Sequence, residues 1–211
     1  MNQIRAYLLA VVFLLTMLAG CGGGGSDESS SGLQQPLRMG GGGGIEGTGA
    51  AIMQLSITAT PACGYDAVHI TIDRVRVNQS AAAESGEAGW SEVILTPPRR
   101  VELTTLANGV PASLGETALE PGRYAQMRLV LAPNTAANPL ANSVTPNGGT
   151  ETALATPSSQ QGGLKLDVDL NLQAGQTSGF ALDFDTCRSI VKRGGSGQYN
   201  LKPVISVKPV P

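Results

Sequence analysis

The chain has 211 residues, with 14 basic and 16 acidic side chains and a formal net charge of −2. This balance excludes a nucleic-acid-binding domain, which would carry a strongly basic surface. The length favours one domain with a tail, and the plentiful valine, isoleucine and leucine predict an aliphatic core although aromatic residues make up only 4% of the chain.

The first 20 residues have the layout of a secretory signal peptide. Arg5 precedes Tyr7–Ala19, a run of 13 uncharged residues, whereas a membrane-spanning helix needs roughly 18 apolar residues. Leu18-Ala19-Gly20-Cys21 then resembles the bacterial lipobox, at which the signal is cleaved and the cysteine is acylated. The resemblance implies that Cys21 is the lipidated first residue of the mature chain. The alternatives are an ordinary signal peptide with a chance cysteine, or an uncleaved anchor.

Lipidation of Cys21 would decide where the protein resides. Two or three acyl chains hold a protein at a membrane essentially permanently, since each buried CH₂ contributes about 0.8 kcal/mol. Gly22 stands where an aspartate would signal retention in the inner membrane of enterobacteria, so the resemblance favours the outer membrane. We expect a palmitate-bearing lipoprotein of a Gram-negative cell envelope, at the outer membrane and facing the periplasm or the cell surface.

A tether follows the anchor. Residues 22–47 contain 11 glycines and four serines, too little apolar matter to offset the entropy of ordering. Residues 21–47 are therefore predicted to form a flexible tether with an average reach of roughly 25–30 Å, and residues 48–211 a single domain. Gly42–Gly47 matches the dinucleotide pattern G-x-G-x-x-G, but no strand is predicted before it and no amphipathic helix after it, so we interpret it as an accident of composition.

From Thr48 onward, apolar residues recur with a period of two between turn residues, which is typical of β-strands. The phase of this alternation changes between Ile72 and Val75, which predicts a β-bulge near Asp73 and Arg74. We expect an antiparallel, all-β sandwich of about 7–9 strands, with long loops over 78–89 and 133–150. The predicted strands are Ala51–Thr58, Ala67–Val77, Trp90–Leu95, Arg100–Leu103, Arg123–Leu131, Gly163–Gln173, Gly179–Asp185 and Tyr199–Val207.

A Pro-Gly turn precedes one of these strands. Leu119–Tyr124 resembles the Leu-x-Pro-Gly-x-Tyr entry into strands of transthyretin-like and immunoglobulin-like sandwiches. In such sandwiches the tyrosine hydroxyl often bonds to nearby backbone and fixes the corner. The resemblance implies this role for Tyr124.

The chain has three cysteines, and an odd number is unusual in an exported protein because one thiol is left without a disulfide partner. Acylation of Cys21 would account for the odd thiol. Cys63 and Cys187 then remain as an even pair in an oxidising compartment, and we predict a disulfide between them. The alternatives are two buried free thiols or a redox pair, although the sequence has no Cys-x-x-Cys spacing.

The domain as a whole resembles a lipoprotein family defined by domain of unknown function 4382. The resemblance covers Thr48–Val207 and implies an exported β-sandwich on a lipid tether, without implying any particular chemistry. The segments that carry it are ACGYDAVHITIDRVRVNQS, GWSEVIL, VELTTLANGV, LGETALEPGRYAQMRLVL, GLKLDVDL, LDFDTCRSIV and YNLKPVISV.

Catalytic residues are few. His69 is the only histidine, so a Ser-His-Asp or Cys-His apparatus would depend on it. It is out of phase with Val68 and Ile70, which predicts a solvated position on the polar face of its strand. Too few ligands remain for zinc, and the sequence has no nucleophile elbow or Walker loop. We therefore expect that the protein is not an enzyme.

The last long strands suggest a calcium site. If Gly163–Gln173 and Gly179–Asp185 form a hairpin in which Leu172 faces Phe180, four carboxylates gather on one face. Such like charges repel, and calcium, which takes six to eight oxygen ligands, would neutralise them. The alternatives are compensation by basic side chains or by solvent. The candidate ligands are Asp167, Asp169, Asp183 and Asp185.

Other side chains suggest binding. The pairs Arg74 with Arg76 and Arg99 with Arg100 fit either an anionic glycan or lipid headgroup, or solvated strand faces. Trp90 fits either a sugar platform or the core. We expect a membrane-anchored, non-catalytic binding or structural module whose partner is an envelope protein or a glycan. The alternative is a calcium-dependent or glycan-binding adhesion-type module.

Overall fold

The computed structural model describes residues 49–61, 63–157, 162–195 and 197–210. The predicted signal peptide, Cys21 and the tether therefore lie outside the described residues. Within the described part, no helix has the length and apolar character needed to cross a membrane.

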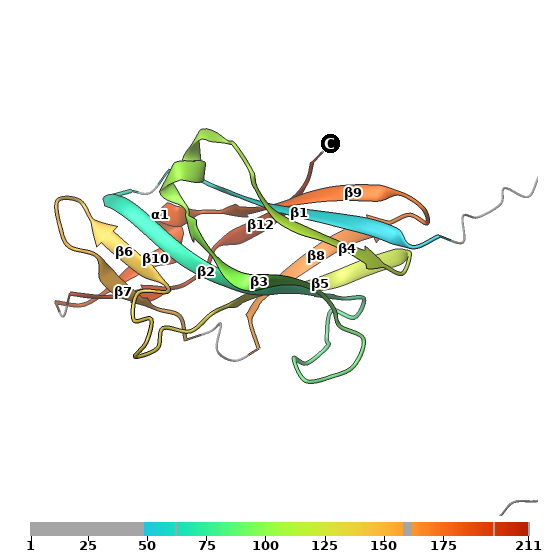
Figure 1. The fold of residues 1–211 in the computed structure, drawn as a ribbon, viewed down its shortest axis with the longest axis horizontal. Coiled ribbons are helices and arrows are strands. Elements are labelled where there is room, and N and C mark those ends of the chain that lie inside the picture. The colour runs from blue at the N-terminus through green and yellow to red at the C-terminus, as the bar shows by residue number, and fades with distance from the viewer. Residues whose placement is uncertain (1–48, 62, 158–161, 196, 211) are drawn as a thin grey trace, which may run out of the picture. The chain divides into compact units, whose positions relative to one another are not determined.

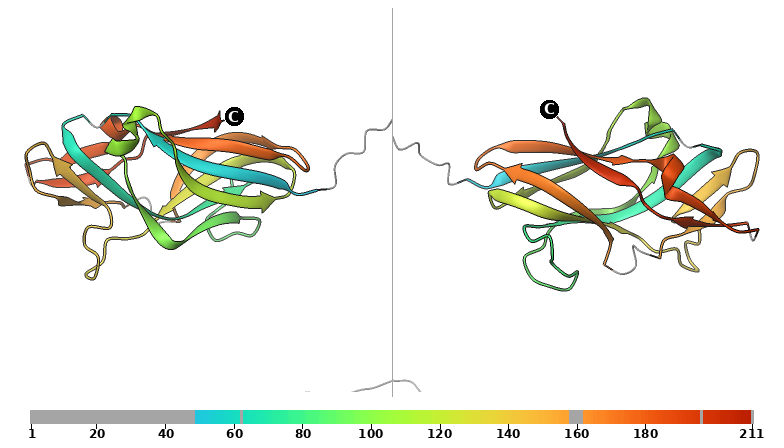
Figure 2. Two further views of the ribbon diagram at one scale, coloured as in Figure 1. Left: turned by 45° about the horizontal axis from the view of Figure 1, so that its top comes forward. Right: turned by 180° about the vertical axis from the view of Figure 1, so that it is seen from behind.

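Two β-sheets pack face to face and enclose the core, so the predicted β-sandwich is confirmed (Figures 1 and 2). The smaller sheet has the order β12 (Ile205–Val210), β9 (Thr177–Phe184), β1 (Ala51–Ala59) and β4 (Ala112–Leu119). The larger has the order β10 (Ile190–Arg193), β11 (Gln198–Leu201), β7 (Thr152–Ala155), β6 (Ser143–Pro146), β2 (Tyr65–Asn78), β5 (Gly122–Leu131) and β8 (Leu164–Leu172), and β3 (Ser91–Glu102) also pairs with β2. A 3₁₀ helix, η1 (Thr104–Asn108), and one helical turn, α1 (Thr186–Ser189), connect strands.

The described residues form 12 strands, more than the alternation predicts. Two predicted strands merge into β3, and the predicted strand over Tyr199–Val207 divides into β11 and β12, which lie in different sheets. β4, β6, β7 and β10 were not predicted. The last three have four residues each, too few to display a period of two. β1 with β9 and β11 with β7 pair in parallel, so the sandwich is mixed rather than purely antiparallel.

Alternating burial along the long strands builds the core. In β8 the four leucines are buried, whereas Lys165, Asp167 and Asp169 are exposed, as the pattern predicts. The β-bulge is also confirmed, because the pairing of β2 with both β3 and β5 shifts between Ile72 and Arg74. The largest fully buried side chains are Phe184, Met53, Leu55, Ile57, Ile70, Ile72, Leu103, Met127, Leu129, Leu154, Leu172 and Leu182.

The tyrosine corner implied by the Pro-Gly entry is present. Tyr124 is buried, and its hydroxyl donates to the Glu120 carbonyl at 3.0 Å across the β4–β5 turn.

Replacing Tyr124 by phenylalanine should lower the free energy of unfolding by about 1 kcal/mol, because the ring stays packed while the Glu120 carbonyl loses its donor. Urea denaturation measures this difference. Tyr65→Phe is the matched control, since the Tyr65 hydroxyl makes no hydrogen bond within the described residues. Equal losses in the two variants would show that the corner bond adds nothing.

Candidate functional site

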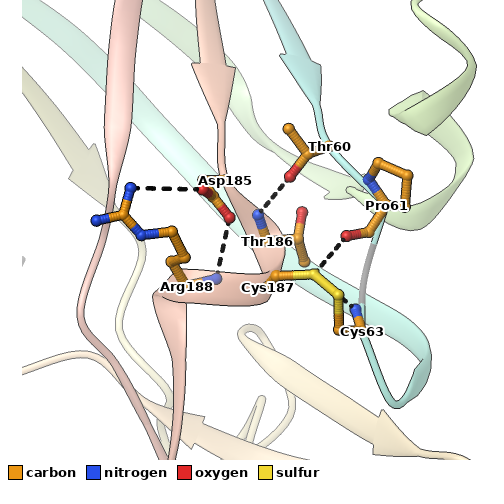
Figure 3. Close-up of a disulfide and its surroundings, with 7 residues drawn as sticks. All are labelled: Thr60, Pro61, Cys63, Asp185, Thr186, Cys187 and Arg188. Atoms are coloured by element: carbon orange, nitrogen blue, oxygen red, sulfur yellow. Dashed lines mark hydrogen bonds and ion pairs between the residues drawn. A yellow bond between two sulfur atoms is a disulfide. The ribbon is translucent and has the colours of Figure 1, made fainter.

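The predicted disulfide is confirmed (Figure 3). Cys63 lies in the loop between β1 and β2, and Cys187 lies in α1, with their Cα atoms 5.0 Å apart. The backbone N–H of Thr186 donates to the Thr60 hydroxyl at 3.2 Å, which adds a second link between the same two segments. The bridge therefore fixes the start of β2 to the segment that leads from β9 into β10.

The predicted hairpin of β8 and β9 is wrong. β8 pairs with β5 in the larger sheet, whereas β9 lies between β1 and β12 in the smaller sheet. The turn between them crosses from one sheet to the other, so the apolar faces of the two strands oppose each other across the core. The alternation of apolar residues is the same in a hairpin and in such a corner, and it could not distinguish them.

The four aspartates consequently do not form a calcium site. Asp169 pairs with Arg123 at 2.6 Å, and Asp167 lies 3.9 Å from Lys165. On the other sheet, Asp183 pairs with Lys208, and Asp185 accepts a hydrogen bond from the backbone N–H of Arg188 at 3.0 Å. Nowhere among the described residues do three or more His, Cys, Asp or Glu side chains gather closely enough to hold a metal ion.

Trp90 stabilises the loop between β2 and β3. The guanidinium groups of Arg76 and Arg128 lie 4.7 and 5.3 Å from the ring centroid, a cation–π arrangement. The indole N–H donates to the Glu84 carbonyl at 3.0 Å, and Arg128 also donates to the Ala83 carbonyl. These contacts anchor the predicted long loop between β2 and β3, and they occupy the tryptophan that could have stacked on a sugar.

The paired arginines contact the protein itself. Arg74 lies 3.1 Å from the Asp73 carboxylate, and Arg76 pairs with Glu92 at 2.7 Å. Arg99 donates to the Ser113 carbonyl. Arg100 donates to Glu151 at 2.6 Å and to the Ser143 hydroxyl at 3.0 Å. These pairings favour an internal role for the four cations over a glycan or headgroup site.

A polar cluster surrounds His69 on the outer face of the larger sheet. β2 lies here between β3 and β6. His69 pairs across the strands with Glu102 of β3 on one side and with Ser143 of β6 on the other. Its Nε2 is 3.9 Å from a Glu102 carboxylate oxygen, and its Nδ1 is 3.9 Å from Glu151. The imidazole is only 17% exposed. The predicted position on the polar face of the strand is confirmed, but the histidine is less solvated than expected, because neighbouring strands and the β6–β7 connection cover this part of the face.

The electrostatics of the cluster keep the histidine neutral. Burial, followed by the positive charge of Arg100, lowers the pKa of His69, and the carboxylates of Glu102 and Glu151 only partly oppose this. The pKa of Glu151 is also lowered, chiefly because the Ser143 hydroxyl donates to it at 2.5 Å and then through Arg100. Since Ser143 donates to a carboxylate rather than to the imidazole, the nucleophile–base hydrogen bond of an acyl-transfer triad is not formed.

The lowered pKa of His69 makes stability depend on pH. Above the unfolded-state value of about 6.5 the imidazole is neutral in both states and costs nothing. As the pH falls below that value, the unfolded chain binds the proton more readily, so folding stability declines. We expect the free energy of unfolding to drop between pH 7.5 and 5.5 in the wild type and to drop less in His69→Gln, as measured by urea denaturation. An equal decline in both proteins would remove His69 as the cause.

A groove of about 740 Å³ lies on the same outer face, over β7 and β11. Ala153 and Ala155 are exposed on this face while Leu154 is buried in the core. Ser143 pairs with Ala153, so the groove begins one strand away from the His69 cluster. The volume is within the range of small-ligand sites, roughly 300–1,000 Å³. The lining includes Asn134, Thr152, Ala153, Ala155, Gln198 and Asn200.

Sequence reasoning missed both the cluster and the groove. Ser143 lies in a segment predicted to be a loop, and Glu151 lies just after it. The two residues meet His69 only because β6 and β7 pair beside β2. The one available signal was the single histidine between apolar residues of a strand.

The model of one protein family, the domain of unknown function DUF4382, matches residues 50–203. The chain belongs to this family. No curated protein and no solved structure matches the chain. The match spans every strand from β1 to β11 and ends before β12.

Proposed function

We propose that this DUF4382 protein is a lipid-anchored module of the bacterial cell envelope that binds a partner without catalysing a reaction. The lipobox-like Leu18–Cys21 after an apolar run supports the anchor. The Cys63–Cys187 bridge supports export, because disulfides persist in oxidising compartments. The missing nucleophile–base bond at His69 favours binding over catalysis.

The proposal rests on where the groove lies relative to Gly49, at which the described domain begins. Gly49 lies beside the β8–β9 turn, where its carbonyl accepts from the Gly175 N–H at 3.2 Å. β1 begins at this end of the sandwich, whereas β6, β7 and β10 lie at the opposite end in each view (Figures 1 and 2). A tether joined at Gly49 would attach at the end of the domain opposite β6, β7 and β10, which would leave the groove accessible to soluble or surface-bound partners.

Cell fractionation tests the anchor. The wild type is expected in the membrane fraction and to be released by detergent, whereas Cys21→Ser should be found in the soluble fraction. Ser31→Ala is the matched control, since it changes one side chain of the predicted tether without touching the lipobox or the disulfide. The same distribution for wild type and Cys21→Ser would refute lipid anchoring through this residue.

Cross-linking in intact cells tests the binding role. A photo-reactive amino acid placed at Gln198, in the groove, should give a discrete cross-linked product, and one placed at Gln173, near the entry of the chain, should not. The absence of a product from Gln198, or equal products from both positions, would contradict a partner at the groove.

A further inference from the structure

We propose that the free edge of β10, beside the groove, binds an extended acidic polypeptide segment by adding it as a strand to the larger sheet. The proposal rests on the binding role proposed above and names its partner chemistry. Strand addition uses main-chain hydrogen bonds for affinity and flanking side chains for selectivity.

The backbone of β10 offers an unpaired edge. β10 ends the larger sheet and pairs with β11 on one side only. The Lys202 N–H donates to the Ser189 carbonyl at 2.8 Å, which makes these two residues a hydrogen-bonded pair. Because bonded and non-bonded pairs alternate in an antiparallel ladder, the backbone N–H and C=O groups of Ile190 and Lys192 point away from β11. They are placed to pair with an added strand.

The segment that forms β10 and β11 is positively charged. Residues 188–202 contain four cations and no carboxylate side chain, in a chain whose net charge is −2. Arg188 lies 3.9 Å from the carboxylate of Asp185, but Lys192 and Lys202 make no ion pair within the described residues. The uncompensated positive charge next to a free edge favours a segment carrying glutamate or aspartate.

The groove favours a peptide over a glycan. Its floor on this face includes the small side chains of Ala153 and Ala155, with the amides of Gln198 and Asn200 beside them. The aromatic residue of the lining, Tyr199, is buried in the core and does not offer an exposed ring on which a sugar could stack. Val191 is 37% exposed and pairs with Asn200, so it lies on the groove side of β10. A strand added to β10 would thus place alternate side chains along Val191 and toward the groove.

Fluorescence anisotropy of a labelled peptide tests the proposal, with the full chain purified in detergent. The probe is an eight-residue peptide that alternates valine and glutamate, and the comparison peptide replaces glutamate by lysine. We expect saturable binding of the acidic peptide, binding at least tenfold weaker for the basic one, and weakening by added salt. This titration does not depend on lipidation or location, so its failure is distinguishable from failure of the anchor.

Three variants locate the site. Lys192→Pro removes an outward N–H that has no partner in the sheet, and it should weaken binding at least tenfold while far-ultraviolet circular dichroism is unchanged. Lys192→Glu with Lys202→Glu leaves the backbone intact and should have the same effect. Lys165→Glu, the same change on β8 at the other edge of this sheet, should stay within twofold of the wild type.

Four results would overturn the proposal. The first is no saturable binding of the acidic peptide, and the second is equal binding of both peptides. The third is wild-type affinity in both Lys192→Pro and Lys192→Glu with Lys202→Glu. The fourth is sedimentation that shows a dimer which Lys192→Pro dissociates. The last would mean that a second copy of the chain occupies the edge.

Discussion

Exchanging Cys63 and Cys187 together for alanine is expected to lower the free energy of unfolding by about 5 kcal/mol. The two residues are separated by 124 positions, and a cross-link over a loop of that length removes much of the entropy of the unfolded chain. Domains of this kind are stable by only about 5–15 kcal/mol. The exchange should therefore leave the domain marginally folded.

Guanidinium denaturation followed by tryptophan fluorescence measures the loss. Wild-type protein in reductant is the control, and it should unfold at the same denaturant concentration as the alanine variant in either redox condition. A difference below about 1 kcal/mol between oxidised and reduced wild type would contradict a stabilising role for the bridge.

Replacing Phe184 by alanine is expected to cost about 3–5 kcal/mol. Phe184 is fully buried on β9, where it is level with Ala59 of β1 and Ile205 of β12. A buried phenylalanine loses both its transfer free energy and its packing contacts when it is truncated, and Ala59 beside it is too small to fill the space. Phe184 is also the last core residue before α1, the helical turn that contains Cys187.

Ile94→Ala is the matched control for Phe184, since Ile94 is 61% exposed on β3. Its change in stability should be within about 0.5 kcal/mol of zero. The two variants can be compared by urea denaturation at one pH. Similar losses in both would mean that the core does not lie between the two sheets.

The long strands could be predicted because they display a period of two over eight or more residues. β8 and β1 are the best examples, and the phase change at Asp73 also located the bulge. The pairing of strands could not be predicted from the same pattern. β8 and β9 are adjacent in sequence and have well-matched apolar faces, yet they lie in different sheets, so the proposed calcium ligands never meet.

The candidate site escaped prediction for a related reason. The His69 cluster and the groove depend on β6, β7 and β11, which have four residues each. β6 pairs with β2 and β11 pairs with β7, and both pairings join segments distant in sequence. Glu151 is 82 positions from His69 in the sequence, and only the pairing of β6 with β2 brings them to 3.9 Å. By contrast, Cys63 and Cys187 could be paired by counting thiols once Cys21 had been assigned to the lipid anchor.

Lipid anchoring through Cys21 is tested most directly by mass spectrometry of the intact mature protein and its N-terminal peptide, isolated from membranes of the bacterium that produces it. We expect a chain that begins at Cys21 and carries two or three fatty acyl groups. A chain that begins at any other residue, or that begins at Cys21 without acyl groups, would contradict it.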